Sequence, residues 1–147
     1  MAEAHRFSVT ASWDRGKESG RVQNADRTFD AEHRGASPLG GPGGAANPEE
    51  LLLAGVSACF TQTWALFVKK LGLPLQSLRL EAACMVEPDP AGGFRITEIE
   101  LHPEVPSDIW AAEREKVEKT LQLAEKYCIV SKAVREGRTF KVTPRPV

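Results

Sequence analysis

The segment from Asn47 to Gly72 constrains the fold most strongly, because it has the pattern of one long apolar helix. Asn47 is a good N-cap, Pro48 suits the first helical position, and Glu49 and Glu50 favour the positive end of the helix dipole. Apolar residues then continue on nearly every side, and Gly72 marks the end of the helix. A helix that is apolar nearly all round is normally buried. We therefore predict a long central helix on which the rest of the chain packs.

Alternating apolar residues predict strands on both sides of this helix. They are expected at residues 5–13 (half-buried), from residue 21, near residues 28–31, and at residues 75–87, 94–101 and 139–143. Two further helices are expected, one capped by Ser107 and Asp108 and one running from Cys128 to about Glu136. The Gly- and Pro-rich residues 33–47 form a loop, which is either functional or a flexible connector. The order β-β-β-α-β-β-α-α-β predicts a single α+β domain over residues 1–147, with a mostly antiparallel sheet.

Composition and charge exclude several classes of function. A net charge of -1 gives no basic patch for nucleic acid or for an anionic membrane. We find no apolar stretch of about 18–20 residues to span a bilayer, and no signal-peptide core at the N-terminus, so a cytoplasmic location is expected. The 3 cysteines are then reduced, and with no C-x-x-C motif and scattered histidines a zinc site is not expected.

The cysteines are the candidates for chemistry, because a thiol reacts as its thiolate and local groups set its pKa. Cys59 is in the middle of the long helix, so it requires a cation from elsewhere, with Arg21, Arg27 and Arg34 as candidates. Cys128 is at an expected helix start, where free backbone N–H groups would favour its thiolate. Either residue could instead only fill the core. No histidine motif lies near them, which gives a Cys-His hydrolase little support.

Cys84 belongs to the alternation of the strand at residues 75–87. We therefore expect it to be a core thiol without a chemical role.

Two segments carry a resemblance to a known family. Residues 47–60, which contain Cys59, and residues 124–134, which contain Cys128, resemble the two cysteine segments of the OsmC/Ohr family of thiol-dependent hydroperoxide reductases. Residues 92–97 resemble the hairpin between them. The resemblance implies an α+β OsmC-like fold, with antiparallel sheets packed around a long buried central helix, in an intertwined homodimer. Ile129 stands where the family usually has proline, and the run that follows is closer to the OsmC-like branch than to the Ohr branch.

The resemblance also implies a reaction. Cys59 would be the peroxidatic cysteine, which attacks an organic hydroperoxide or hydrogen peroxide, and Cys128 would resolve it as a disulfide. An external dithiol, such as the dihydrolipoyl group of a lipoylated protein, would then reduce the disulfide, without metal or bound cofactor. Glu49 matches the family's glutamate, and Arg21, or alternatively Arg27, its arginine. The role implied is defence against oxidative and osmotic stress.

Helix geometry adds an argument for the dimer. Glu49 and Cys59 are ten residues apart on one helix, about 15 Å along its axis, so they cannot meet within one subunit. If both serve one site, Glu49 comes from a second chain and orients the arginine there. Two alternatives stay open: a redox sensor or small-molecule binder of the same fold, and a structural dimer whose cysteines only pack.

Overall fold

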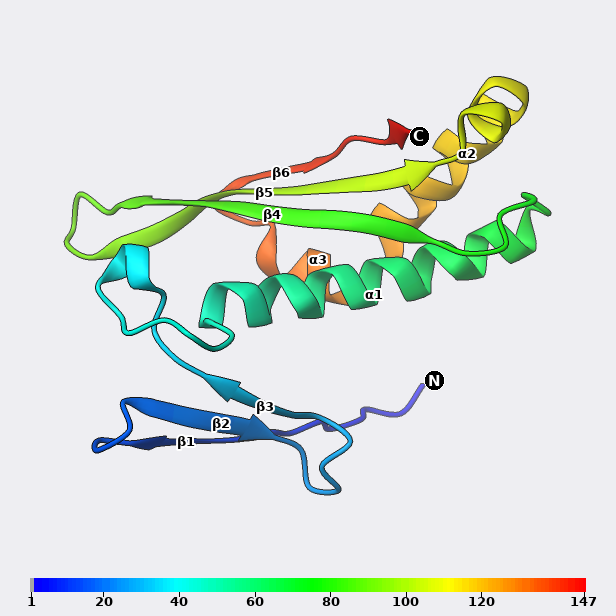
Figure 1. Cartoon of the computed structure of the whole chain (residues 1–147). Coiled ribbons are helices and arrows are strands. Elements are labelled where there is room, and N and C mark those ends of the chain that lie inside the picture. Colours follow the sequence, from blue (N-terminus) through cyan, green and yellow to red (C-terminus); the bar gives the residue numbers. More distant parts are fainter. Residues whose placement is uncertain (1) are drawn as a thin grey trace. The chain divides into compact units, whose positions relative to one another are not determined.

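The computed structural model describes residues 2–147, which form two compact units. The first extends to Leu51 and the second runs from Leu52 to Val147. Both appear in Figure 1, coloured along the chain. The expected α+β class is confirmed, whereas a single domain over the whole chain stays a prediction.

The first unit is a three-stranded antiparallel sheet in the order β1-β2-β3. Its strands are β1 (Thr10–Asp14), β2 (Ser19–Gln23) and β3 (Asp30–His33), and the short 3-10 helix η1 (Ser37–Leu39) follows. The prediction that residues 5–13 form a half-buried strand is wrong, because β1 begins at Thr10 and all its residues are exposed. Alternation shows which residues share a face of a strand, but not whether that face is covered.

The long helix α1 (Pro48–Lys70) forms as its sequence predicts. Its start is a capping box, in which the Glu50 N–H donates to Asn47 Oδ1 at 2.8 Å and the Asn47 N–H donates to Glu50 Oε1 at 3.1 Å. Its end is marked by Gly72, which adopts a positive φ of 67° that favours glycine. The expected cap and stop of this helix are both confirmed.

Within one chain α1 is buried along one stripe only. Val56, Phe60, Trp64 and Val68 repeat every four residues on this stripe and are buried. By contrast, Leu66 is 48% exposed. The apolar surface of α1 is therefore wider than a single chain covers.

By length and composition alone, α1 could also cross a membrane. Its mean hydropathy is 1.7 over the most apolar window, and 22% of that window is buried. The expectation that no apolar stretch is long enough is therefore wrong for this helix. The core helix of a soluble protein passes the same test, so this feature is weak evidence for a membrane span.

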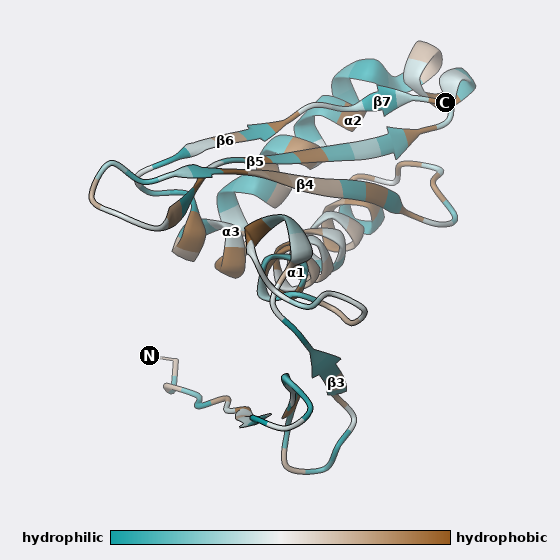
Figure 2. Cartoon of the chain, turned by 60° about the vertical axis from the view of Figure 1, so that its left-hand side comes forward, coloured by the Kyte–Doolittle hydropathy of each residue, from teal (hydrophilic) through white to brown (hydrophobic). Residues whose placement is uncertain are grey.

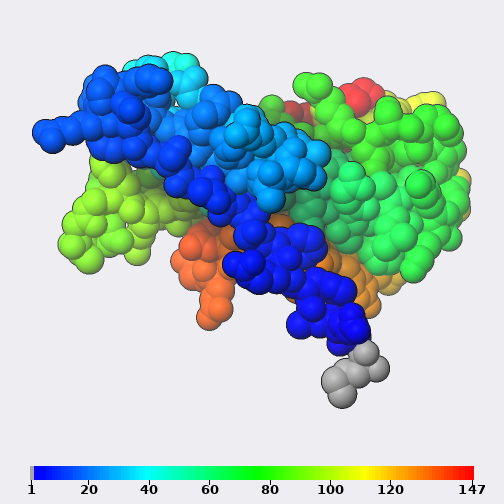
Figure 3. Space-filling view, turned by 90° about the horizontal axis from the view of Figure 1, so that it is seen from below, coloured from blue at the N-terminus to red at the C-terminus, as the bar shows by residue number. Residues whose placement is uncertain are grey.

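The sheet of the second unit is built on one long hairpin. Strands β4 (Arg79–Pro88) and β5 (Phe94–Val105) pair in antiparallel fashion, with Cys84 partly buried opposite Ile99. Strands β6 (Thr139–Val142) and β7 (Arg145–Pro146) both run parallel to β5. Parallel pairing follows from the helical crossover before β6, and neither it nor β7 was predicted. The far end of the hairpin projects beyond the helices of this unit in Figure 1 and forms a yellow-green lobe in Figure 3.

Helices α1 and α2 (Ser107–Tyr127) cover one face of this sheet, and the short α3 (Ile129–Val134) follows α2 (Figures 1 and 2). A buried hydrogen bond joins the first two helices: Trp64 Nε1 donates to Thr120 Oγ1 at 3.0 Å. The expectation that Ser107 caps α2 is wrong. Pro106 precedes the helix without a side-chain cap, and the Ser107 hydroxyl donates to the Val147 carbonyl at 3.0 Å.

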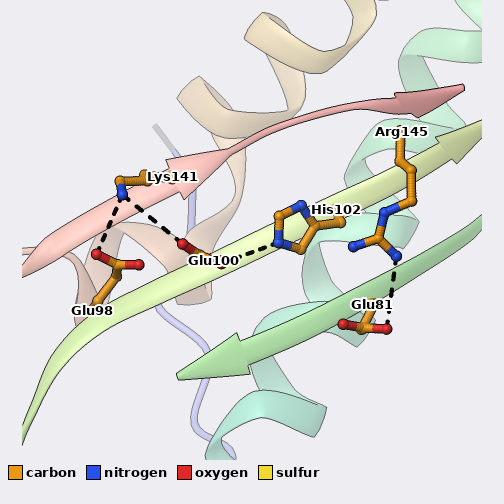
Figure 4. Close-up of polar contacts among 6 residues, drawn as sticks. All are labelled: Glu81, Glu98, Glu100, His102, Lys141 and Arg145. Carbon is orange, nitrogen blue, oxygen red and sulfur yellow. Dashed lines mark hydrogen bonds and ion pairs between the residues drawn. The ribbon is translucent and has the colours of Figure 1, made fainter. Parts of the chain in front are cut away.

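The opposite face of the sheet carries ion pairs (Figure 4). Along β5, Ile99, Leu101 and Val105 are buried on the helical side, while the alternate residues bear charge. The contacts are Lys141 to Glu98 at 3.3 Å and to Glu100 at 3.9 Å, His102 Nε2 to Glu100 Oε2 at 3.1 Å, and Arg145 to Glu81 at 3.8 Å. Such exposed pairs contribute little each. The buried core of this unit, which contains Cys128, lies on the other side of the sheet.

Candidate active site: the Cys59–Cys128 pair

Cys59 lies partly buried on α1, beside the stripe that packs on the sheet. It follows Val56 by one helical turn and packs against the core cluster that contains Cys128. The backbone of Cys59 is held within a regular helix. The site is thus built on a rigid element.

Cys128 is the single residue between α2 and α3. Its N–H donates to the Ala124 carbonyl at 2.8 Å, and its carbonyl accepts from the Lys132 N–H at 3.1 Å. Its backbone is extended, with φ -67° and ψ 111°, and its side chain is fully buried. The expected helix start at Cys128 is confirmed, with Cys128 as the N-cap of α3.

The fold brings the two thiols together. Both cysteines are free, and the Cys128 thiol faces the Cys59 sulfur closely enough to act as a hydrogen-bond donor to it. One sulfur comes from α1 and the other from the α2–α3 junction. Two thiols in contact can be linked by a disulfide on oxidation.

Cys59 has a lowered pKa, and its cause is the start of α3. Burial alone would raise the pKa of Cys59, but the Val130 N–H, the Cys128 thiol and the Ile129 N–H all face its sulfur and lower it. Thr63 lowers the pKa of Cys59 least of these groups, and its hydroxyl donates to the Cys59 carbonyl at 2.9 Å. These donors are neutral, so the lowered pKa does not depend on the cation that we expected Cys59 to require.

Cys128 has a raised pKa, which corrects the expectation that free N–H groups would favour its thiolate. Burial is the main cause, and the neighbouring Cys59 adds to it, whereas Ser131 lowers the pKa of Cys128 only in part. The N–H groups of Ile129 and Val130 serve Cys59 instead. The sequence predicts the helix start correctly but not which sulfur its N–H groups face.

The other predicted site residues lie in the first unit. Arg21, on β2, forms an ion pair with Asp30 at 2.8 Å. Arg27 is in the turn before β3 and has a positive φ of 59°. Glu49 is in the first turn of α1, and its Oε2 is buried with no hydrogen-bond partner. The roles of Arg21 (or Arg27) and Glu49 in the cysteine site stay predictions.

Residue types alone did not identify the groups that shift the pKa values of the two cysteines. These groups are the backbone N–H groups of residues 129 and 130 and the hydroxyl of Ser131. Ser131 is fully buried, and its Oγ donates to the Cys128 sulfur at 3.0 Å. A signal was present in the sequence, since a serine three residues after a helix-starting cysteine faces back toward it. Chemically, a low-pKa thiolate beside a second thiol can be oxidised to a sulfenic acid and then captured as a disulfide.

The chain is similar to known proteins over most of its length. The family model described as OsmC-like protein matches residues 41–143. An organic hydroperoxide resistance protein-like 2 of Staphylococcus epidermidis is 28% identical over 134 residues, 90% of this chain and 91% of that protein. Among solved structures, an organic hydroperoxide resistance protein from Elizabethkingia anophelis, with thiocyanate bound, has a TM-score of 0.79 and 28% identity, covering 100% of both chains. OhrB, the organic hydroperoxide resistance protein of Bacillus subtilis, has a TM-score of 0.73 and 25% identity, covering 96% of this chain and 98% of that one. The chain belongs to the OsmC-like protein family.

Proposed function

We propose that the protein is a cysteine-based peroxidase that reduces organic hydroperoxides, with hydrogen peroxide as the alternative oxidant, in the cytoplasm. The observation that carries the proposal is the contact between Cys59, whose pKa is lowered, and the buried Cys128 thiol. The names of the relatives, which refer to organic hydroperoxide resistance, support the same class of substrate.

The reaction follows from the two sulfur atoms. The Cys59 thiolate attacks the peroxide O–O bond, the alkoxide leaves as an alcohol after taking a proton, and Cys59 becomes a sulfenic acid. Cys128 then attacks the Cys59 sulfur, the S–O bond breaks and water leaves, so that a disulfide remains. An external dithiol, such as a dihydrolipoyl group, reduces the disulfide and restores both thiols.

Arg21 and Glu49 would complete the site in a homodimer. A buried carboxylate oxygen without a hydrogen-bond donor is costly, and Glu49 Oε2 is in this position in the single chain. A guanidinium such as that of Arg21 supplies paired donors for a carboxylate and can also stabilise a thiolate. The apolar surface that α1 leaves exposed within one chain, including Leu66, supports a second copy as its cover.

Peroxide consumption with a dithiol reductant tests the function. We expect Cys59→Ser to abolish turnover and Cys128→Ser to allow a single oxidation that then stalls. Cys84→Ser is the matched control and should retain full activity, because Cys84 lies in the β4–β5 hairpin, outside the pair. Mass spectrometry of peroxide-treated protein should show Cys59 linked to Cys128.

Full peroxidase activity in Cys59→Ser would refute these roles. Stoichiometric oxidation without sustained turnover would favour the redox sensor instead. Light scattering tests the dimer, and a particle of 16.1 kDa at micromolar concentration would contradict it.

A further inference from the structure

The hydroxyl of Ser131 has an unusual partner for a helical serine. Ser57, Thr61 and Thr63 on α1 each donate to a carbonyl oxygen of the preceding turn, as serine and threonine commonly do in helices. Ser131 Oγ donates instead to the sulfur of Cys128, at 3.0 Å. Both side chains are fully buried, so water does not compete for this contact.

The geometry gives the contact one orientation. Cys128 is held by backbone hydrogen bonds to both flanking helices, and Ser131 is one turn further on in α3. The Ser131 N–H also faces the sulfur, although it forms no regular cap hydrogen bond. The hydroxyl is therefore the defined donor to the Cys128 sulfur, which itself faces Cys59.

A resolving thiol needs such a donor. Cys128 must act as a thiolate to attack the oxidised Cys59, but burial raises its pKa, and the sulfur of Cys59, the titratable group that faces it from α1, raises it further. The side chains packed around Cys128 from α1, α2 and β5 are mainly apolar. Against this background the Ser131 hydroxyl favours the charged form.

We propose that Ser131 is a positioning residue for Cys128: its hydroxyl orients the Cys128 sulfur and stabilises its thiolate during attack on Cys59. This inference rests on the proposed function. In the step concerned, the Cys128–Cys59 S–S bond forms and the leaving group departs from Cys59 with the electron pair of the broken bond. The Cys128 sulfur is oxidised and the Cys59 sulfur is reduced, while the Ser131 proton stays on its oxygen.

A disulfide-exchange assay isolates this step without peroxide. In a Cys84→Ser background, which leaves Cys59 and Cys128 as the thiols, a limiting amount of 5,5′-dithiobis(2-nitrobenzoate) labels Cys59. Cys128 then attacks this mixed disulfide and expels thionitrobenzoate, whose absorbance is followed over a range of pH. We expect Ser131→Ala to slow this release roughly tenfold at neutral pH, as the loss of a hydrogen bond to a charged group would. At high pH, where Cys128 is ionised without help, the difference should shrink.

Two controls separate positioning from stability. Thr120→Val removes another buried hydroxyl of the same core, one that bonds Trp64 rather than sulfur, and should leave the release rate unchanged. If Ser131→Ala fails to fold, Ser131→Thr and Ser131→Val are compared with each other instead, because threonine and valine have the same shape and differ in the hydroxyl. The threonine variant should then be the faster.

Equal release rates and pH profiles for the parent and Ser131→Ala would overturn the inference. So would an equal slowing by Thr120→Val. A failure of the proposed function looks different: the parent protein would not consume peroxide, while the exchange assay would still show the dependence on Ser131.

Discussion

Replacing Ile129 by proline tests the origin of the lowered pKa of Cys59. Proline has no N–H, so Ile129→Pro removes one of the two backbone donors that face the Cys59 sulfur. The backbone should accept the change. Ile129 is the first residue of α3, a position that proline favours, and the extended φ and ψ of Cys128 suit a residue before proline. The Ile129 side chain is 73% exposed, so little packing is lost.

The expected magnitude follows from one lost donor among several. A hydrogen bond to a charged group contributes about 1.5–3 kcal/mol, and we take about 1 kcal/mol because sulfur is a diffuse acceptor and the Val130 N–H remains. A loss of about 1 kcal/mol lowers the thiolate population about fivefold at a pH below the pKa. The rate at which iodoacetamide alkylates Cys59, read by peptide mapping across pH, should fall by this factor. At high pH the two rates should converge.

The matched control is Ile129→Ala, which removes the side chain but keeps the N–H. Its alkylation rate should equal that of the parent. If Cys59 in Ile129→Pro is alkylated at the parental rate while the circular dichroism is unchanged, the Ile129 N–H does not lower the pKa of Cys59. The same conclusion follows if the alanine variant slows as much as the proline variant.

Two further predictions concern stability. Thr120→Val leaves Trp64 Nε1 buried without an acceptor and should lower the free energy of unfolding by about 1–3 kcal/mol in urea denaturation; no loss would show that the Trp64–Thr120 bond is not a net stabiliser. Glu98, His102 and Lys141 hold the pKa of Glu100 below its usual value of 4.5, so the unfolded chain binds more protons as the pH falls. The stability that Glu100 contributes is then present above about pH 4.5 and lost below it. Glu100→Gln should make the fall in unfolding free energy below that pH shallower than in the parent, and equal slopes would contradict this linkage.

Much of the fold could be predicted from local sequence patterns. The Asn47 cap and the Gly72 stop of α1 depend on neighbouring residues, and both were predictable from the sequence. The parallel pairing of β6 with β5 depends on a crossover of more than thirty residues, so no local pattern contained it. Ser107 shows a further limit of local prediction. It is a good capping residue, but its hydroxyl donates to the carbonyl of Val147, which is distant in the sequence.

The candidate site was also predictable only in part. Cys59 and Cys128 could be chosen from the sequence, because each lies in a distinct helical context. Which thiol would be the more acidic could not, since this depends on where the N–H groups of Ile129 and Val130 point once α3 docks beside α1. Backbone donors have no residue-type signature, and the role of Ser131 became visible only through its contact with sulfur.

The asymmetry between the two thiols sets the order in which they react. Burial raises the pKa of Cys59, but the N–H groups of α3, the Cys128 thiol and Thr63 together outweigh it, whereas the pKa of Cys128 is raised because burial and Cys59 outweigh Ser131. Cys59 is also the more accessible, since Cys128 is fully buried. A limiting amount of iodoacetamide near neutral pH should therefore modify Cys59 well before Cys128 in the folded protein, and peptide mapping over time would show the order. In urea the chain unfolds and both cysteines lose these surroundings, so the alkylation rates of Cys59 and Cys128 should become equal. Earlier labelling of Cys128 in the folded protein would reverse the roles of nucleophile and resolving thiol.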